Sequence, residues 1–196
     1  MANLAPNLTR LRNFVQDMTR LVERHGADEP RMLDEGERLL KGLIANDDWL
    51  PDEFAAPSKD SYRQYLLYCD PLERFSVASF VWMPGHRTPI HDHTVWGLVG
   101  VMRGQECCEE FDLSVRKTNT HHSSAGEVDR VSPTVGDIHV VSNAGKETAV
   151  SIHVYGANIG AVRRHVYVPE TGEAKEFVSG YHNRTLPNIW DRSSAG

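Results

Sequence analysis

The 196-residue chain has few cysteines, no long apolar run and no basic cluster. Its three cysteines, Cys69, Cys107 and Cys108, are too few for a disulfide framework, and an adjacent pair does not easily bridge to itself. Such a sparse, odd set is typical of a reducing compartment. No stretch approaches the ~18 consecutive apolar residues of a membrane-spanning helix, and the start MANLAPNLTRLRNF lacks the apolar centre of a signal peptide. We therefore expect a cytoplasmic protein with no membrane partner.

Basic residues are outnumbered by acidic ones. The chain carries 21 Lys and Arg against 27 Asp and Glu, a formal net charge of −6, and no basic run is longer than Arg163-Arg164. A nucleic-acid-binding surface needs a basic patch that this composition does not suggest. We expect no nucleic-acid partner, and nothing in the composition indicates an oligomeric state.

The apolar residues that are present predict one domain over residues 1–196, with a helical segment at 1–50. Apolar residues recur at helical spacing over residues 6–25, from Leu8 to Val22, and Gly26 is a plausible stop. A second helix is expected after Pro30, although Gly36 and Gly42 weaken it. Both apolar faces are interpreted as packing surfaces rather than partner grooves.

After the polar segment 47–60 the pattern changes to short strand-like runs separated by turn residues. The expected strands are 62–68, 75–83, 95–102, 106–113, 137–141, 149–155 and 164–168. Seven such runs without intervening helices predict a mainly β fold, an antiparallel sandwich or small barrel with its core in residues 60–168. The tail, residues 179–196, is expected to be irregular and to wrap the barrel.

The segment PIHDHTVWG, residues 89–97, places two histidines two positions apart. On an extended strand, His91 and His93 project to one face with their Cα atoms ~6–7 Å apart, so both imidazoles can bind one metal ion. Paired histidines can also simply hydrogen-bond or face solvent, and the flanking residues decide between these readings.

The flanking glycines resemble the first signature of the cupin superfamily, with Gly97 where many cupins carry a ligand glutamate. A second block resembles the second cupin signature, with one extra residue between Pro133 and Gly136; it comprises Gly126, Pro133, Gly136, His139 and Asn143. The resemblance implies a small cupin-type antiparallel β-barrel, jelly-roll-like, and makes His139 the third ligand.

Three neutral imidazoles leave the metal its full 2+ charge and open positions. Zinc also accepts three histidines and a water, so ligand type does not choose between iron and zinc.

The run SIHVY places Ser151, His153 and Tyr155 at period two, so all three side chains point the same way from one strand. A Ser-His-Tyr hydrogen-bonded chain would set the imidazole tautomer and aim the tyrosine hydroxyl at whatever the metal binds. A polar, solvent-facing strand would give the same spacing.

Together these segments resemble the thiol dioxygenases of the cysteine dioxygenase family. The resemblance covers residues 60–168, through YRQYLL, MPGHRTPIHDHTVWG, PTVGDIH and SIHVYG. It implies an Fe(II) centre on His91, His93 and His139, and O2 with a small thiol carboxylate as reactants that give a sulfinate. Tyr155, held by His153 and Ser151, would donate a hydrogen bond to the substrate or to oxygen.

Two departures bear on the substrate. Animal enzymes of this family place a carboxylate-binding arginine two residues after a tyrosine. In this chain the residue two positions after Tyr62 is Gln64, and glutamine forms no charged bidentate pair with a carboxylate. Gly97 stands where those enzymes have a cysteine cross-linked to tyrosine, so no cross-link is expected. Glutamine resembles the bacterial branch that favours 3-mercaptopropionate, in which a later arginine assists the carboxylate. Arg164 matches it best, with Arg163 as the competing choice.

Other candidates receive structural interpretations. Trp96 is expected to pack rather than line the pocket, and Asp92 to make a structural hydrogen bond on the opposite face. Cys107 and Cys108 are interpreted as small, partly buried core residues. The remaining histidines are not assigned to the metal, and the pair His121-His122 is expected in a polar loop.

Three alternatives stay open at the level of sequence. An isomerase or hydrolase on the same barrel would use zinc or nickel and turn over without oxygen. A ligand-binding module would consume no oxygen with any thiol. An authentic L-cysteine dioxygenase differs from the favoured interpretation only through Gln64.

Overall fold

The computed structural model describes residues 6–193. Two helices, α1 (Leu8–His25) and α2 (Glu29–Ile44), precede a short 3-10 helix, Asp52–Phe54. The strands that follow are β1 (Arg63–Cys69), β2 (Ser76–Trp82), β3 (Ile90–His91), β4 (Gly97–Arg103), β5 (Gln105–Phe111), β6 (Lys117–Ser124), β7 (Val128–Val131), β8 (His139–Asn143), β9 (Ala149–Tyr155), β10 (Arg164–Tyr167) and β11 (Ala174–Phe177).

The two helices form where the sequence predicts them. The apolar face of α1 is buried, and Gly26 follows its last residue. Helix α2 begins after Asp28, whose side chain accepts a hydrogen bond from the backbone N–H of Arg31, with Pro30 in the first turn. Gly36 does not break α2, because a side chain there would press on Leu98 of β4, so the glycine allows the helix to approach the sheet closely.

The strands form two antiparallel sheets, in the orders β1-β2-β9-β4-β7 and β11-β10-β3-β8-β5-β6. From β2 to β5, and again from β7 to β10, each successive strand lies in the other sheet. This winding between two sheets is the jelly-roll arrangement, so the expected fold class is confirmed: mainly β, with N-terminal helices packed on a cupin-type jelly roll.

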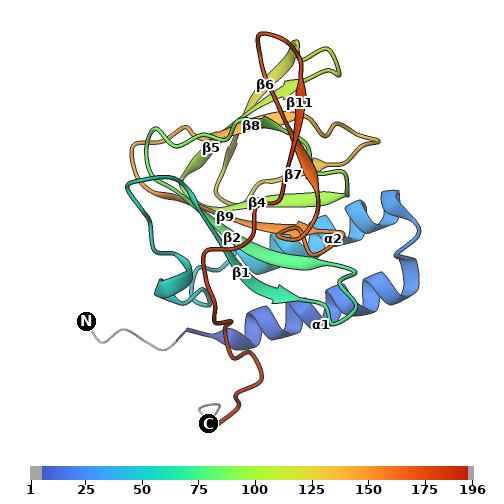
Figure 1. Cartoon of the computed structure of the whole chain (residues 1–196). Helices are drawn as coiled ribbons and strands as arrows, with labels where there is room; N and C mark the ends of the chain where they lie inside the picture. Colours follow the sequence, from blue (N-terminus) through green and yellow to red (C-terminus); the bar gives the residue numbers. More distant parts are fainter. Residues whose placement is uncertain (1–5, 194–196) are drawn as a thin grey trace.

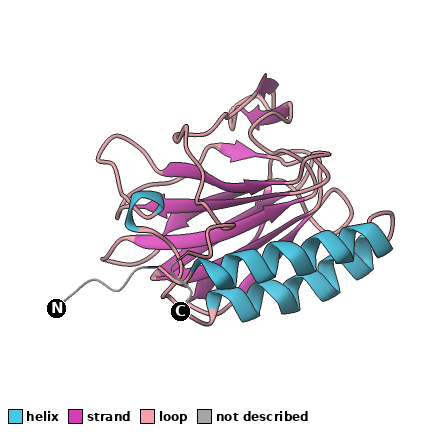
Figure 2. Ribbon diagram, turned by 90° about the horizontal axis from the view of Figure 1, so that it is seen from below, coloured by secondary structure: helices cyan, strands magenta, loops and turns pink. Residues whose placement is uncertain are grey.

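Both helices cover the outer face of the sheet that contains β2, β9 and β4 (Figure 1; Figure 2). The main apolar core lies between these helices and this sheet, around fully buried side chains such as Leu40, Trp49 and Leu98. The helices therefore stabilise the sheet from outside, and the space between the two sheets holds a smaller apolar cluster together with polar side chains.

The expected strands are found within a few residues of their predicted bounds, but four elements differ. The histidine strand β3 is only two residues long, and His93 lies beyond its end. The segment with His121 and His122 is not a loop but β6, an edge strand with polar side chains because its outer edge has no strand neighbour. Strands β7 and β11 were not expected, since each has four residues and no apolar alternation.

The tail from residue 179 to 193 has no helix or strand, as expected, and it returns to β1. Asn183 binds both backbone groups of Leu66, and the backbone N–H of His182 donates to the carbonyl of Gln64. Within residues 6–193, no helix is both long enough and apolar enough to cross a membrane.

The packing of α2 on β4 predicts a large cost for Leu98→Ala. The side chain is fully buried under the helices, so its loss should lower the free energy of unfolding by about 2–5 kcal/mol. Urea unfolding measures this, with Leu113→Ala as the matched control because Leu113 is 88% exposed. Equal effects of the two substitutions would contradict the role of this helix-sheet interface.

Candidate metal centre

The three predicted ligands come together through the pairing of three strands. β3 lies between β10 and β8, and His91 stands directly opposite His139 in the β3–β8 register. His93 follows two residues later and reaches the same point from the loop before β4. The sequence spacing therefore leads to the expected convergence, although one extended strand does not carry both histidines.

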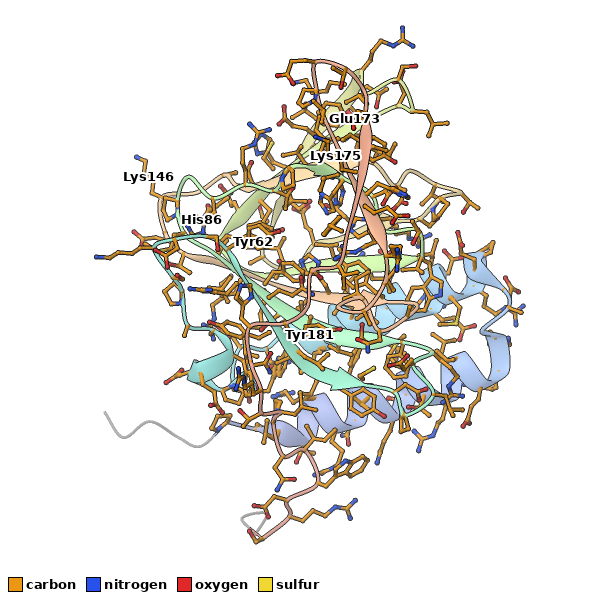
Figure 3. The ribbon with its side chains drawn as sticks, viewed as in Figure 1. Tyr62, His86, Lys146, Glu173, Lys175 and Tyr181 are labelled. Carbon is orange, nitrogen blue, oxygen red and sulfur yellow. The ribbon has the colours of Figure 1, made fainter. Side chains whose placement is uncertain are left out.

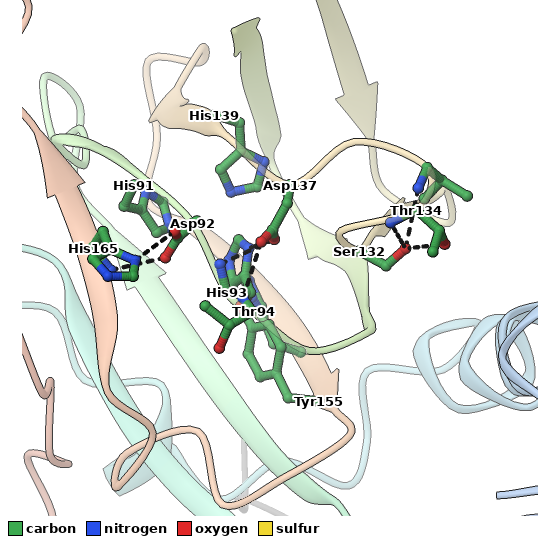
Figure 4. Close-up of polar contacts among 12 residues, drawn as sticks. His91, Asp92, His93, Thr94, Ser132, Thr134, Asp137, His139, Tyr155 and His165 are labelled. Carbon is green, nitrogen blue, oxygen red and sulfur yellow. Dashed lines mark hydrogen bonds and ion pairs between the residues drawn. The ribbon is translucent and has the colours of Figure 1, made fainter. Parts of the chain in front are cut away.

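The three imidazoles surround one point in the interior (Figure 4). Their ring centroids are 4.8–4.9 Å apart, and one nitrogen of each ring lies within 4.8 Å of the others. All three side chains are buried. This is a group that could hold a metal ion.

The outer nitrogen of each ring already has a neighbour. Nδ1 of His91 lies 3.1 Å from the carbonyl of Pro89, and Nδ1 of His93 lies 2.9 Å from Oδ1 of Asp137. Nδ1 of His139 lies 3.5 Å from Sγ of Cys108. A hydrogen on Nδ1 of the first two rings satisfies an oxygen acceptor and leaves Nε2 with a free lone pair, the arrangement that metal-ligating histidines adopt. The donor set fits a divalent metal.

The surroundings keep two of these imidazoles neutral. Burial, followed by the neighbouring His93, lowers the pKa of His91 to about 3. Burial and the other histidines also lower the pKa of His139 well below its ordinary value. Neutral imidazole is the form that binds a metal, so His91 and His139 need no deprotonation step near neutral pH.

Asp137 is a residue of the site to which the sequence analysis gave no role. Its carboxylate accepts hydrogen bonds from the His93 ring and from the backbone N–H groups of His93 and Thr94 (Figure 4). Burial acts to raise the pKa of Asp137, but these hydrogen bonds outweigh burial and lower it. Its position two residues before His139 was the one sequence feature that could have indicated a role at the site. No spacing rule connects Asp137 to His93.

Because Asp137 orients His93, Asp137→Asn should weaken metal binding by about 10- to 100-fold. Competition with a chromophoric chelator measures iron(II) affinity directly. Asp60→Asn, at an exposed carboxylate, is the control. Wild-type affinity in Asp137→Asn would show that this hydrogen bond does not support the ligand.

The predicted Ser-His-Tyr side chains form a hydrogen-bonded chain inside β9. Ser151 Oγ lies 2.8 Å from Nε2 of His153, and Nδ1 of His153 lies 2.8 Å from the Tyr155 hydroxyl. All three are buried, and the Tyr155 ring stacks on His93 at 5.2 Å between centroids. The chain therefore ends at the metal-ligand cluster.

Trp82 and Glu106 adjoin the serine end of this chain. Trp82 Nε1 donates to Ser151 Oγ at 3.2 Å, and the single serine hydrogen goes either to Nε2 of His153 or to the Glu106 carboxylate. In the first case His153 Nδ1–H donates to the tyrosine oxygen, and the Tyr155 O–H is free to point to a ligand. Burial raises the pKa of Tyr155 above its ordinary value, so the hydroxyl keeps its proton.

Gly97 is required next to this tyrosine. It stands opposite Tyr155 in the β4–β9 register, and a Cβ at position 97 would lie 2.7 Å from Cδ1 of the ring. Gly97, which stands where the resembling enzymes have a cross-linked cysteine, is thus in direct contact with Tyr155.

The predicted carboxylate-binding residues line the same cavity as the histidines. This cavity has a volume of about 40 Å³ and is bordered by Tyr62, Gln64 and Arg164. Nε2 of Gln64 and Nε of Arg164 are buried without a hydrogen-bond partner. Burial lowers the pKa of Arg164, but a guanidinium stays charged in proteins.

The structure separates the two candidate arginines. Arg164 is 4% exposed, donates to Ser179 Oγ at 2.7 Å and lies over the Phe177 ring. Arg163 points outward and pairs with Glu176. Ser179 and Phe177 were not expected at the site, because no local pattern connects β11 and the tail to the cavity.

The other candidates lie elsewhere. Asp92 binds the backbone and ring of His165 and the hydroxyl of Tyr167, the expected structural role (Figure 4).

Trp96 packs on the core and is absent from the residues that line the cavity. His86 accepts a bond from the backbone of Met83 and lies with Lys146 at an edge of the molecule (Figure 3). Cys107 is half-buried and Cys108 buried, as expected.

A buried carboxyl group, Glu106, lies behind the Ser-His-Tyr chain. Burial raises its pKa to about 7, against hydrogen bonds from Ser151 and Trp82 that lower it, and its Oε1 has no partner. Because the folded-state pKa lies above the unfolded value of 4.5, the folded protein holds a proton that the unfolded chain releases between about pH 4.5 and 7. Stability therefore falls as pH rises through this window.

Glu106→Gln should remove this pH dependence. Relative to the variant, the wild type should lose on the order of 3 kcal/mol of unfolding free energy between pH 4 and pH 8. Chemical unfolding at a series of pH values, with chelator present, measures the difference. The exposed Glu147→Gln is the control, and parallel profiles for wild type and Glu106→Gln would refute the assignment.

No protein-family model matches the chain. In fold, the chain is similar to a conserved protein with a double-stranded beta-helix domain from Klebsiella pneumoniae subsp. pneumoniae. That match has 19% identity and a TM-score of 0.47 over 58% of this chain and 93% of that one. A cupin-like protein from Thermotoga maritima has 22% identity and a TM-score of 0.43, over 62% and 83% of the two chains. Oxalate oxidase in complex with the substrate analogue glycolate has 19% identity and a TM-score of 0.43, over 51% and 53%. Likenesses at these identities and TM-scores do not bear on activity.

Proposed function

We propose that this protein is a mononuclear iron(II) thiol dioxygenase that converts a small thiol carboxylate, preferably 3-mercaptopropionate, to its sulfinate. One observation carries the proposal: two unpaired buried donors, on Gln64 and Arg164, line the same small cavity as the three-histidine cluster. One unpaired N–H of a buried guanidinium and one of a buried amide favour an anionic ligand, because leaving such donors unpaired costs free energy.

The cavity suits a ligand with one carboxylate and one metal-binding end. A carboxylate would accept from Arg164 and Gln64, and a metal-binding group would reach the three imidazoles, which line the same cavity. A volume of about 40 Å³ is a few times the 10–15 Å³ that one water needs, which limits the ligand to a handful of heavy atoms.

The polar lining favours a substrate without an amine. Its residues include imidazoles, hydroxyls, an amide and a guanidinium, but no carboxylate lines the cavity among the residues that the structure describes. The ammonium group of L-cysteine would therefore lack an ionic partner and lie near Arg164. This supports 3-mercaptopropionate over L-cysteine.

Iron(II), when bound by three neutral histidines, would bring the thiolate and O2 together. The overall reaction is R–SH + O2 → R–SO2H, in which sulfur loses four electrons and O2 gains them, so no external reductant is required. A reducing cytoplasm, the location expected from the sequence, keeps both the thiol and iron(II) reduced.

The protein's own side chains would position the reactants. Gln64 and Arg164 would hold the carboxylate, and Tyr62 would close the cavity wall, stacked on Trp82 at 4.7 Å between ring centroids. Tyr155 would donate a hydrogen bond to the substrate or to oxygen, with its orientation set by His153 and Ser151.

Oxygen consumption tests the proposal. Iron(II)-reconstituted protein should consume O2 faster with 3-mercaptopropionate than with L-cysteine, and His91→Ala should abolish uptake with both thiols. Preference for L-cysteine would make the protein a cysteine dioxygenase. No uptake with either thiol, in protein shown to bind iron, would overturn the proposal and leave a metal-binding cupin-type protein.

Arg164→Met tests the carboxylate end. Loss of charge-assisted hydrogen bonds should raise KM for 3-mercaptopropionate by about 10- to 100-fold. Turnover of 3-mercapto-1-propanol, which lacks the carboxylate, should be unchanged. Arg163→Met is the matched control on the exposed neighbour, and an equal loss for both thiols would argue against carboxylate binding by Arg164.

A further inference from the structure

A second cavity, of about 210 Å³, shares lining residues with the proposed substrate cavity. His139 and Val141 border both cavities, and the second is otherwise lined from β4, β5, β6, β7 and the loop before β8. Three of its side chains carry sulfur, oxygen and nitrogen donors: Cys108, Glu110 and His121. Neither the sequence interpretation nor the proposed function uses this cavity.

Strand register brings these three donors to one face. Cys108 of β5 stands directly opposite His121 of β6, and Glu110 lies two residues after Cys108 on the same strand. The alternate pair, Cys107 and His122, is also matched across the two strands but faces the other side. One side of the hairpin therefore presents a ligand set, and the other provides matched controls.

The donor atoms are already close. One ligand atom from each of Cys108, Glu110 and His121 lies within 4.8 Å of the others. Tetrahedral zinc with bonds of about 2.0–2.3 Å needs ligand atoms about 3.3–3.8 Å apart. Glu110 and His121 are partly exposed, with side-chain exposures of 44% and 32%, so small side-chain movements can close this gap.

The histidine is held as a ligand would be. Its Nε2 lies 3.1 Å from Oδ2 of Asp129, which also accepts a hydrogen bond from Ser123 Oγ at 2.7 Å. Its Nδ1 lies on the Glu110 side, 3.5 Å from Oε1. A carboxylate that fixes one ring nitrogen and leaves the other for a metal is the usual support of a ligating histidine.

A second observation concerns the lining of this cavity. Glu106, two residues before Cys108 on β5, lines it, is 3% exposed, and has an Oε1 without a partner. A buried side-chain oxygen without a partner is costly, which indicates that the cavity receives a hydrogen-bond donor or a cation. Among residues 6–193, Arg130 is the only Lys or Arg in the lining, and it is already paired with Asp34 and Glu37.

We infer that Cys108, Glu110 and His121 form a second metal site, for one divalent ion of zinc-like preference. The mixed thiolate, imidazole and carboxylate set suits zinc, and the cavity leaves the fourth position for water. On binding, the Cys108 thiol releases its proton to solvent and the thiolate becomes a ligand. This inference does not depend on the thiol dioxygenase proposal, because it uses none of the substrate-binding residues.

Cobalt(II) titration tests the site separately from the three-histidine centre. Only the second site offers a thiolate, so a near-ultraviolet sulfur-to-cobalt charge-transfer band reports its occupancy. The wild type should bind two equivalents, and the band should grow with one of them. Zinc should remove the band by displacing cobalt, since the same donors bind both ions.

Matched variants locate the ligands. Cys108→Ser and His121→Gln should bind one equivalent and show no band, whereas Cys107→Ser and His122→Gln should behave as the wild type. His91→Ala should keep the band while losing the other equivalent. Circular dichroism of each metal-free variant checks that the fold is retained.

Three results would overturn the inference: no band in the wild type, a band that survives in Cys108→Ser, or a band that is lost in His91→Ala. The last would mean that the Cys108 thiolate binds the ion of the three-histidine centre. Oxygen consumption with 3-mercaptopropionate is measured separately from the cobalt band, so failure here and failure of the proposed function are distinguishable.

Discussion

The pairing of the two-residue strand β3 between β10 and β8 is the constraint on which the site depends. It sets His91 opposite His139, and it sets His91 opposite Val166, two residues after Arg164. Asp92 strengthens the contact between β3 and β10, because its carboxylate accepts hydrogen bonds from the backbone and side chains of β10. A strand too short to be stable alone thus holds ligands and a guanidinium around one cavity, because hydrogen bonds from both neighbours fix its register.

The interior between the sheets combines a smaller apolar cluster, which includes Phe80 and Trp82, with polar side chains. α1 and α2 place the main apolar core on the outer face of one sheet, so the space between the sheets can also hold imidazoles, a guanidinium and hydroxyls. Most of the buried polar side chains that the structure describes have hydrogen-bond partners. The exceptions, on Gln64, Arg164 and Glu106, lie at the two cavities that His139 borders. Unpaired buried polar atoms at cavities indicate ligands more directly than the fold does.

His139 joins the two cavities. Its ring centroid lies 4.8 Å from those of His91 and His93, and its Nδ1 lies 3.5 Å from the Cys108 sulfur. Burial and the neighbouring histidines lower its pKa, so the ring is neutral and has one hydrogen to share. Alternation along β5 and β6 places the Cys108 and His121 donors beside it, an arrangement that follows from period two and strand register alone.

Local patterns in the sequence determined the two helices, seven of the strands and the fold class, because apolar periodicity and turn residues act over a few neighbours. The spacings of PIHDHTVWG and SIHVY, with the family resemblance of PTVGDIH that added His139, also predicted which side chains would meet, and the structure brings them together, although their roles stay predictions. Only the tertiary structure decided that Arg164 rather than Arg163 faces the cavity, that Asp137 supports His93, and that the segment of His121 is a strand with a ligand-like face. These depend on register between strands far apart in the chain, which no local spacing contains.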